Sequence, residues 1–226
     1  DDAAPEGPAR EVRSPADGRL VGQVHEATAA EVARALDAAQ AGLEQWSAMP
    51  VAERAAVLRR IAELYEAHTA EFCAIAAREA GKILLDGVAE VREAVDFLRF
   101  YADEAERLEA EEPGSARGVF VCISPWNFPL AIYTGQIAAA LAAGNAVLAK
   151  PAEQTPIIAA RAAELFREAG VPKAAFQLLP GDGPTVGGPL TSDPRIAGVC
   201  FTGSTETAQR IHRALAANAP ADAVLI

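Results

Sequence analysis

The chain has 226 residues, of which 51% are hydrophobic and 23% are charged. This composition supplies enough apolar material for the core of one large domain, and it excludes an intrinsically disordered, a collagen-like and a disulfide-stapled protein. The formal net charge of −11 repels nucleic-acid phosphates, so no nucleic-acid partner is expected. No segment approaches the ~18–20 uninterrupted apolar residues of a membrane span.

The cysteines and the amino terminus indicate the cellular compartment that is expected for the chain. Cys73, Cys122 and Cys200 are scattered, without the spacing of a metal site or a disulfide framework, which indicates a reducing compartment. No secretory signal is visible, so a cytoplasmic location is expected. Because the chain starts at Asp1 rather than at a methionine, we expect it to be processed or cut from a longer protein.

The first half of the sequence predicts a hairpin followed by helices. Two short extended pieces flank the turn at Asp17-Gly18. Thr28 and Glu31 form a capping-box pattern at the start of a helix. Apolar residues at helical spacing predict further helices, whose acidic outer faces are interpreted as solvated surface. The helices are expected over about 28–46, after residue 50, over 69–80 and over about 87–108.

From Arg117 onward, short apolar strands alternate with helices, which is typical of a parallel α/β sheet. Strands are expected over 119–123, 146–149, 175–178 and 198–201, with a last apolar piece over 221–226. Helices are expected over about 129–143, 156–169, 184–190 and 204–217. The predicted fold class is α/β, with a helical N-terminal layer and a Rossmann-like sheet. Its expected parts are an arm (1–14), the hairpin and helices (15–116) and an incomplete NAD-binding portion (117–226).

Ligands bind beyond the carboxyl ends of such strands, and polar loops follow the first two of them. In the loop 124–129, Asn127 has two interpretations: a cap for the following helix, which the spacing alone favours, or an amide donor for an oxyanion. Trp126 belongs either to the core or to the wall of a ligand site. Lys150 and Glu153 form either a surface ion pair or a pair that holds ribose hydroxyls, and the spacing favours neither.

Glycine-containing loops follow the later strands. Gly181-Asp182-Gly183 begins a weak motif, because Gly187 lies one position beyond the spacing of a dinucleotide loop. A turn with positive φ angles explains it equally well. The segment 202–205 opens a helix, so its N–H groups and hydroxyls suit a pyrophosphate, whereas a Ser or Thr N-cap is the simpler alternative. The position of all four loops at one edge of the sheet is what favours a ligand site.

No metal cluster and no nucleophile–base pair is visible in the sequence. Each cysteine is interpreted as a small buried hydrophobic residue rather than as a catalytic thiol. The histidines, which also lack a catalytic spacing, are His25, His68 and His212.

Taken together, the loops resemble the aldehyde dehydrogenase superfamily. The resemblance rests on ISPWNFPLAIYTGQIAAALAAGNAVLAKPAEQTP at 123–156, LLPGDG at 178–183 and FTGSTETA at 201–208. Within the superfamily, REAGKILLDGVAEVREAVDFLRFYA at 78–102 looks like the glutamate-semialdehyde (1-pyrroline-5-carboxylate) dehydrogenase module of the bifunctional proline utilization A flavoenzymes. The likeness covers about residues 15–226.

The resemblance implies NAD+ bound along the strand ends. By position, Lys150 and Glu153 would hold the adenosine ribose, and Asn127 would match the oxyanion amide of the family instead of a cap. Ala208 stands where larger relatives often have a glycine, which argues against a close dinucleotide-type turn there. The other residues that would border the cofactor are Ile123, Ser124, Pro125, Trp126, Gly183 near the adenine, and Gly203 and Ser204 at the pyrophosphate.

The family's chemistry implies a cysteine thiolate that attacks the aldehyde and a glutamate that activates water for thioester hydrolysis. In the family both follow the strand that resembles Val224-Leu225-Ile226, where this sequence stops. The resemblance therefore implies the first half of an NAD-dependent enzyme that oxidises L-glutamate 5-semialdehyde to L-glutamate in proline catabolism, and these residues alone are expected to be inactive.

The alternatives are another semialdehyde dehydrogenase and a non-catalytic NAD-binding or assembly module. The family analogy also implies a small-molecule aldehyde substrate and a homo-oligomeric parent protein. FAD would belong only to an upstream domain outside this chain.

Overall fold

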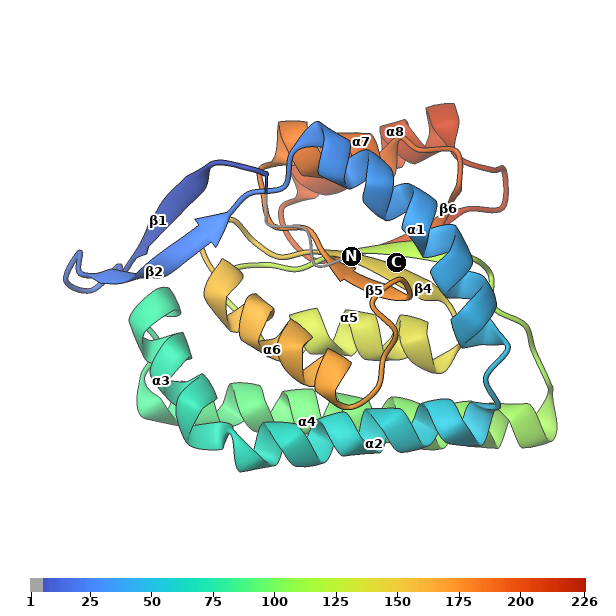
Figure 1. Cartoon of the computed structure of the whole chain (residues 1–226), viewed down its shortest axis with the longest axis horizontal. Coiled ribbons are helices and arrows are strands. Elements are labelled where there is room, and N and C mark those ends of the chain that lie inside the picture. Colours follow the sequence, from blue (N-terminus) through green and yellow to red (C-terminus); the bar gives the residue numbers. More distant parts are fainter. Residues whose placement is uncertain (1–5) are drawn as a thin grey trace.

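In the computed structural model, which describes residues 6–226, a parallel sheet lies between two sets of helices (Figure 1). The strands of this sheet are ordered β5-β4-β3-β6-β7, and all of their pairings are parallel. A separate antiparallel hairpin precedes the sheet. The strands are β1 (Ala9–Arg13), β2 (Leu20–His25), β3 (Val119–Ile123), β4 (Ala146–Lys150), β5 (Phe176–Leu178), β6 (Ile196–Phe201) and β7 (Val224–Leu225).

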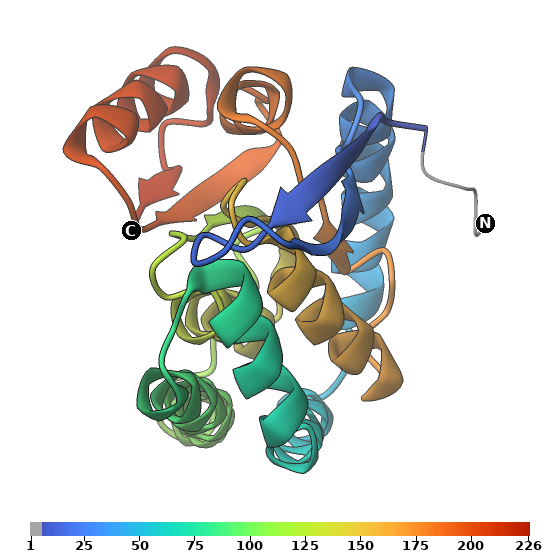
Figure 2. The ribbon, with the colours of Figure 1, turned by 90° about the vertical axis from the view of Figure 1, so that its left-hand side faces the viewer.

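The helices form three layers around the sheet. Helices α1, α7 and α8 cover one face, α5 and α6 cover the other, and α2 and α4 lie beneath α5 and α6 (Figures 1 and 2). The helices are α1 (Ala29–Ser47), α2 (Val51–Ala67), α3 (Thr69–Ala80), α4 (Leu84–Glu111), α5 (Ala131–Ala142), α6 (Pro156–Glu168), a π-helical turn η1 (Gly183–Gly187), α7 (Gly188–Thr191) and α8 (Thr205–Asn218). The α/β fold class predicted from the sequence is confirmed.

Local signals in the sequence place the first helices correctly. The capping box before α1 is present, with the Thr28 N–H donating to Glu31 Oε2 at 2.8 Å and the Glu31 N–H donating to Thr28 Oγ1 at 3.2 Å. Helix α3 ends at Gly81, whose φ of 67° is the left-handed conformation that glycine adopts easily.

Several boundaries differ from the sequence predictions, of which three bear on the fold. Helix α4 starts at Leu84 rather than at Gly87, because this glycine is a packing position: a Cβ there would lie 3.3 Å from the Cα of Cys73. Helix α5 starts at Ala131 rather than at residue 129. Strand β1 lies within the range 1–14 that was expected as an arm, and residues 1–5 of that range lie outside the described part of the chain.

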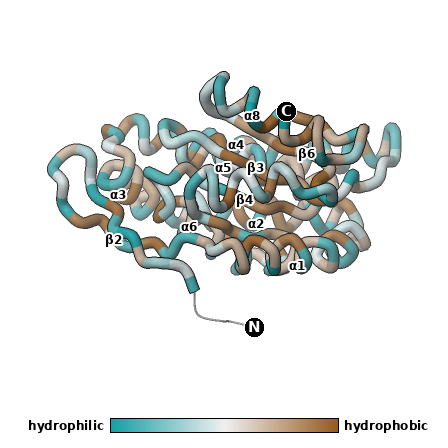
Figure 3. The backbone as a smooth tube through the Cα atoms, turned by 90° about the horizontal axis from the view of Figure 1, so that it is seen from above, coloured by the Kyte–Doolittle hydropathy of each residue, from teal (hydrophilic) through white to brown (hydrophobic). Residues whose placement is uncertain are grey.

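The sheet separates two hydrophobic cores because alternate residues of each strand point to opposite faces. In β3, Phe120 and Cys122 pack with α2, α4, α5 and α6, whereas Val119 and Val121 pack with α1, α7 and α8. Hydrophobic residues accordingly run through the central strands in Figure 3. None of the described helices has the length and apolar character needed to cross a membrane.

Gly42 provides a test of the packing between α1 and the sheet. A Cβ at this position would lie 2.2 Å from the carbonyl carbon of Ala174, and the backbone there cannot rotate away as a side chain would. We expect Gly42→Ala to lower the free energy of unfolding by about 1–3 kcal/mol, although alanine ordinarily favours a helix. Urea unfolding measures the change. The matched control is Gly114→Ala, where a Cβ meets no atom within 4 Å; equal losses in both variants would contradict the assignment.

Candidate functional site

The order of the strands reverses between β3 and β6. The chain builds outward from β3 to β4 and β5, and then returns to place β6 on the other side of β3. In parallel sheets, the carboxyl ends of the two strands at such a switch point border a crevice that binds ligands. The loops 124–130 and 202–204 flank this crevice, and the hairpin β1–β2 lies in front of this side of the molecule in Figure 2.

Hydrogen bonds join the loops at the switch point. The Thr202 N–H donates to the Ile123 carbonyl oxygen at 3.1 Å, and the Ser124 N–H donates to the Lys150 carbonyl oxygen at 3.3 Å. Gln136 reaches up from α5, and its Nε2 donates to the Ile123 carbonyl oxygen at 3.3 Å and to Thr202 Oγ1 at 3.2 Å. The Gln136 Oε1 atom is buried without a hydrogen-bond partner among the described residues. The Gln136 side chain therefore joins the end of β3 to the loop after β6 and keeps an unpaired acceptor beneath these loops.

Buried glutamates occupy the amino-terminal ends of α5 and α6. Glu90, from α4, accepts from the N–H groups of Leu130 at 3.0 Å and Ala131 at 2.8 Å, and it also binds Lys82 Nζ at 2.6 Å. Glu79, from α3, accepts from the N–H groups of residues 157 and 158 at 2.6 and 2.9 Å. Because each carboxylate takes up the free N–H groups of a helix start, neither end is open to an external anion.

Helix α8 begins differently. The Ser204 hydroxyl accepts from the Thr207 N–H at 3.2 Å, so its cap is a neutral group, and Gly203, Ser204 and Thr205 are all exposed. The turn η1 is capped by the Asp182 carboxylate, which accepts from the Thr185 N–H at 2.6 Å. At the other described helix starts on this edge, the backbone N–H groups donate to carboxylates. At the start of α8 they do not, so this helix start is suited to bind an anion.

Lys150 ends β4 as a buried side chain. Its ammonium lies 3.9 Å from Glu153 Oε1 and donates to the Pro151 carbonyl oxygen at 3.4 Å, which is a long contact. Burial lowers the pKa of Lys150, and the carboxylates of Glu153, Asp182 and Glu26 oppose this shift. The Glu153 side chain is about half exposed. The surface ion pair considered from the sequence is therefore wrong for Lys150, which is a buried cation with capacity to donate further hydrogen bonds.

Arg10, in strand β1 of the hairpin, holds the loop after β4 in place. Its Nη2 donates to the Glu153 carbonyl oxygen at 2.6 Å, while its Nε pairs with Glu26 at 2.5 Å. The turn η1 packs against the Lys150 side chain. A Cβ on Gly187 would lie 3.6 Å from this side chain. Gly183 faces open space, with no atom within 4 Å of a Cβ built there.

Asn127 does not cap α5. The backbone N–H groups at that helix start bind Glu90, and the cap position itself falls on Leu130 without a side-chain hydrogen bond. The capping interpretation from spacing is therefore wrong, and the Asn127 side chain is exposed in the loop after β3. Trp126 beside it is 55% exposed, which excludes the core interpretation and leaves the indole available at the surface of the site.

The cysteines are buried, as their sequence contexts predict. Cys73 packs on α3, and Cys122 and Cys200 are buried within β3 and β6. Burial raises the pKa of the Cys73 thiol. Among the described residues, no group of histidine, cysteine, aspartate and glutamate side chains is arranged to hold a metal ion.

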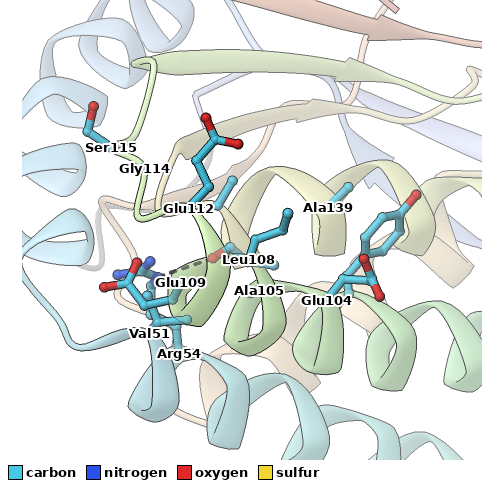
Figure 4. Close-up of a pocket in the computed structure, with 13 residues that line it drawn as sticks. Val51, Arg54, Glu104, Ala105, Leu108, Glu109, Glu112, Gly114, Ser115 and Ala139 are labelled. Atoms are coloured by element: carbon cyan, nitrogen blue, oxygen red, sulfur yellow. Dashed lines mark hydrogen bonds between the residues drawn. The ribbon is translucent and has the colours of Figure 1, made fainter.

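A cavity of about 240 Å³ lies between α2, α4 and the end of α5 (Figure 4). Arg54 lines it, and its guanidinium donates to the carbonyl oxygens of Ala142 and Met49, the first at 3.3 Å. Ala142 is the last residue of α5, whereas Met49 lies in the connection between α1 and α2. Arg54 therefore caps α5 and joins it to this connection, and we assign the cavity no part in the site.

Three residues that shape the site carry no direct signal in the sequence: Glu79, Glu90 and Gln136. The expectation of solvated acidic helix faces is wrong for both glutamates, which are 3% and 2% exposed. The signal that was available for Glu90 is its position between Gly87, Val91 and Ala94, on the buried stripe of α4. A charged residue on an apolar stripe indicates a buried partner.

Residues 3–225 match the aldehyde dehydrogenase family, and the chain belongs to this family. It is 56% identical over 197 residues to the bifunctional protein PutA of Escherichia coli K12, covering 87% of this chain and 15% of that protein. The chain therefore spans only a small part of that relative.

Solved structures of aldehyde dehydrogenases have the same fold as this chain. A point mutant of the 1-pyrroline-5-carboxylate dehydrogenase of Thermus thermophilus is 34% identical with a TM-score of 0.91, over 96% of this chain and 45% of that one. An NAD-dependent benzaldehyde dehydrogenase from Corynebacterium glutamicum is 30% identical with a TM-score of 0.91, over 99% of this chain and 52% of that one. The aldehyde-dehydrogenase-like fold expected from the sequence is confirmed.

Glu79 predicts a pH-dependent stability. Burial raises the pKa of its carboxyl from 4.5 to about 7, against the opposing effect of the two N–H groups of α6 and of Arg10. Between these values the folded chain holds a proton that the unfolded chain has released. The contribution of Glu79 is therefore fully present below pH 4.5 and is lost as the pH rises through about 7, by about 3 kcal/mol in total.

Urea unfolding at pH 5 and pH 8 measures this loss. In Glu79→Gln, which cannot ionise, we expect the loss between the two pH values to be smaller by most of that amount. Glu63→Gln, on the exposed face of α2, is the control and should behave as the unsubstituted chain. An unchanged pH dependence in Glu79→Gln would contradict the assignment.

Proposed function

We propose that this chain is the NAD-binding segment of a dehydrogenase that oxidises L-glutamate 5-semialdehyde to L-glutamate in proline catabolism. Membership of the family supports an NAD-dependent aldehyde oxidation, and the named relatives PutA and 1-pyrroline-5-carboxylate dehydrogenase support this substrate. The observation that carries the cofactor assignment is the open amino terminus of α8 at a switch point where the neighbouring helix starts are taken by carboxylates.

The described residues fit a dinucleotide. The N–H groups at Gly203 and Ser204 would bind the pyrophosphate, since they are exposed and uncapped by an acid. Lys150 and Glu153 would hold the adenosine ribose, with the buried ammonium donating and the carboxylate accepting. Gly183 would leave room for the adenine. The residues that would border the remainder of the cofactor are Ile123, Ser124, Pro125 and Trp126.

Bound NAD+ would supply the hydride acceptor, and this chain's own residues would orient the two reactants. The exposed amide of Asn127 would donate to the oxyanion that forms on the aldehyde oxygen. The three cysteines of the chain are buried in helix and strand packing. We therefore propose that the attacking cysteine and the glutamate base come from outside these 226 residues.

The gene that encodes the chain tests this function. Its reading frame beyond Ile226 should contain a glutamate and then a cysteine at the family's spacing, and the whole purified protein should reduce NAD+ with L-glutamate 5-semialdehyde. Turnover with other semialdehydes at a higher kcat/KM would contradict the substrate. A frame that stops without the two residues, with NAD+ binding retained, would instead identify a non-catalytic cofactor-binding module.

A substitution at Ser204 tests the anion site. Aspartate caps helices as well as serine does, so Ser204→Asp should keep α8 intact while placing a negative charge where the pyrophosphate would bind. We expect the Kd for NAD+ to rise at least about tenfold, equivalent to about 1.4 kcal/mol. Isothermal calorimetry measures it, and Ser204→Asn, a neutral cap of the same size, is the control. Equal affinities for the Asp and Asn variants would exclude this helix end as the pyrophosphate site.

A further inference from the structure

Two cysteines lie side by side directly beneath the crevice. Cys122 of β3 and Cys200 of β6 are direct partners in the parallel register of these neighbouring strands. Both side chains belong to the core on the α5 face of the sheet. The register of the strands therefore places the two cysteine side chains next to each other at the switch point.

The spacing of the strands permits a bond between these sulfurs. Neighbouring strands lie about 4.7–4.9 Å apart, within the range of about 4.4–6.8 Å that disulfides span between Cα atoms. The third cysteine, Cys73, lies on α3 and has no such partner, since both other cysteines are on the sheet.

The two thiols are not equivalent. The proximity of the two thiols lowers the pKa of Cys200 and raises the pKa of Cys122. Cys200 is 8% exposed as a residue, against 1% for Cys122. Since the thiolate is the reactive form, Cys200 is the thiol that reacts first with a small oxidant.

We propose that Cys122 and Cys200 form a reversible dithiol–disulfide site that hydrogen peroxide oxidises. The Cys200 thiolate attacks one peroxide oxygen, the O–O bond breaks, and the products are a sulfenic acid and a hydroxide that takes up a proton to become water. Cys122 then attacks the sulfenic sulfur, the S–S bond forms, and a second water leaves with the Cys122 proton. The two sulfurs together lose two electrons, and one peroxide is reduced to two waters.

The bond would act on the loops that follow the two strands. Cys122 lies two residues before Ser124, and Cys200 lies two residues before Thr202. Joining β3 to β6 at this level would cross-link the two walls of the crevice, and a thiol reductant would release them. The dithiol does not depend on the proposed cofactor, because it rests on the register of two strands alone.

Peptide mapping of the whole protein tests the proposal. The reduced protein is treated with hydrogen peroxide, its free thiols are alkylated, and it is digested with trypsin without reduction. Trypsin releases Cys122 in the peptide 118–161, since Lys150 precedes a proline, and Cys200 in the peptide 196–210. We expect a cross-linked species of these peptides, lighter by two hydrogen atoms than their sum, that disappears on treatment with dithiothreitol.

Three variants make the result specific. Cys73→Ser should form the same cross-linked species, whereas Cys122→Ser and Cys200→Ser should not. In Cys122→Ser, the sulfenic acid on Cys200 should persist and be trapped by dimedone, because the sulfur that resolves it is absent. Recovery of both peptides as alkylated thiols from the peroxide-treated protein, or as sulfinic and sulfonic acids without any cross-link, would overturn the proposal.

Discussion

Charged side chains of the helical layer hold α5 and α6 at both ends, and the position of these helices on the sheet depends on these contacts. Glu90 and Glu79 bind the N–H groups at their starts, while Arg54 and Arg60 donate to carbonyl oxygens at their ends, Ala142 at 3.3 Å and Ala169 at 2.9 Å. Each charge complements the helix dipole at its end. Glu79, Glu90 and Arg54 are buried, and burying such groups costs free energy unless they are paired. The hydrogen bonds therefore fix the position of the helical layer on the sheet as well as stabilising it.

The same contacts determine where the chain can bind an anion. The starts of α5 and α6 lie beyond the carboxyl ends of β3 and β4, where a dinucleotide-binding fold commonly places phosphate. The glutamates fill both positions with carboxylates, and the π-helical turn after β5 carries a carboxylate cap of its own, from Asp182. The start of α8 is left, next to the switch point. In the proposed function, these contacts of the helical layer leave the start of α8, on the other side of β3, for the pyrophosphate.

Features encoded by local spacing could be predicted from the sequence, and features created by docking could not. The apolar run of β3 and the capping box of α1 involve residues within a few positions of each other, and both were predicted correctly. The role of Glu90 depends on N–H groups some 40 positions along the chain. The cap interpretation of Asn127 failed for the same reason, since its spacing was correct but a distant carboxylate already occupied the helix start. At the site, the loops were predictable because parallel strands end at one edge; the buried Gln136 was not.

Two polar groups near the ends of β3 and β4 are less completely hydrogen-bonded than the buried charges of the helical layer. Glu79, Glu90 and Arg54 are each buried with short or multiple hydrogen bonds. Lys150, although buried, has only the long contact to the Pro151 carbonyl oxygen and a carboxylate 3.9 Å away, and Gln136 Oε1 has no partner among the described residues. An under-satisfied buried donor or acceptor costs about 1–3 kcal/mol, and folding alone does not compensate for it. Lys150 ends β4, and the Gln136 side chain contacts the last residue of the neighbouring strand β3. A bound ligand with hydroxyl and amide groups would complete the hydrogen bonds of both side chains. The Tyr133 hydroxyl is also buried without a partner among the described residues, so it is the position of Lys150 and Gln136 beside the strand ends that supports the proposed binding site.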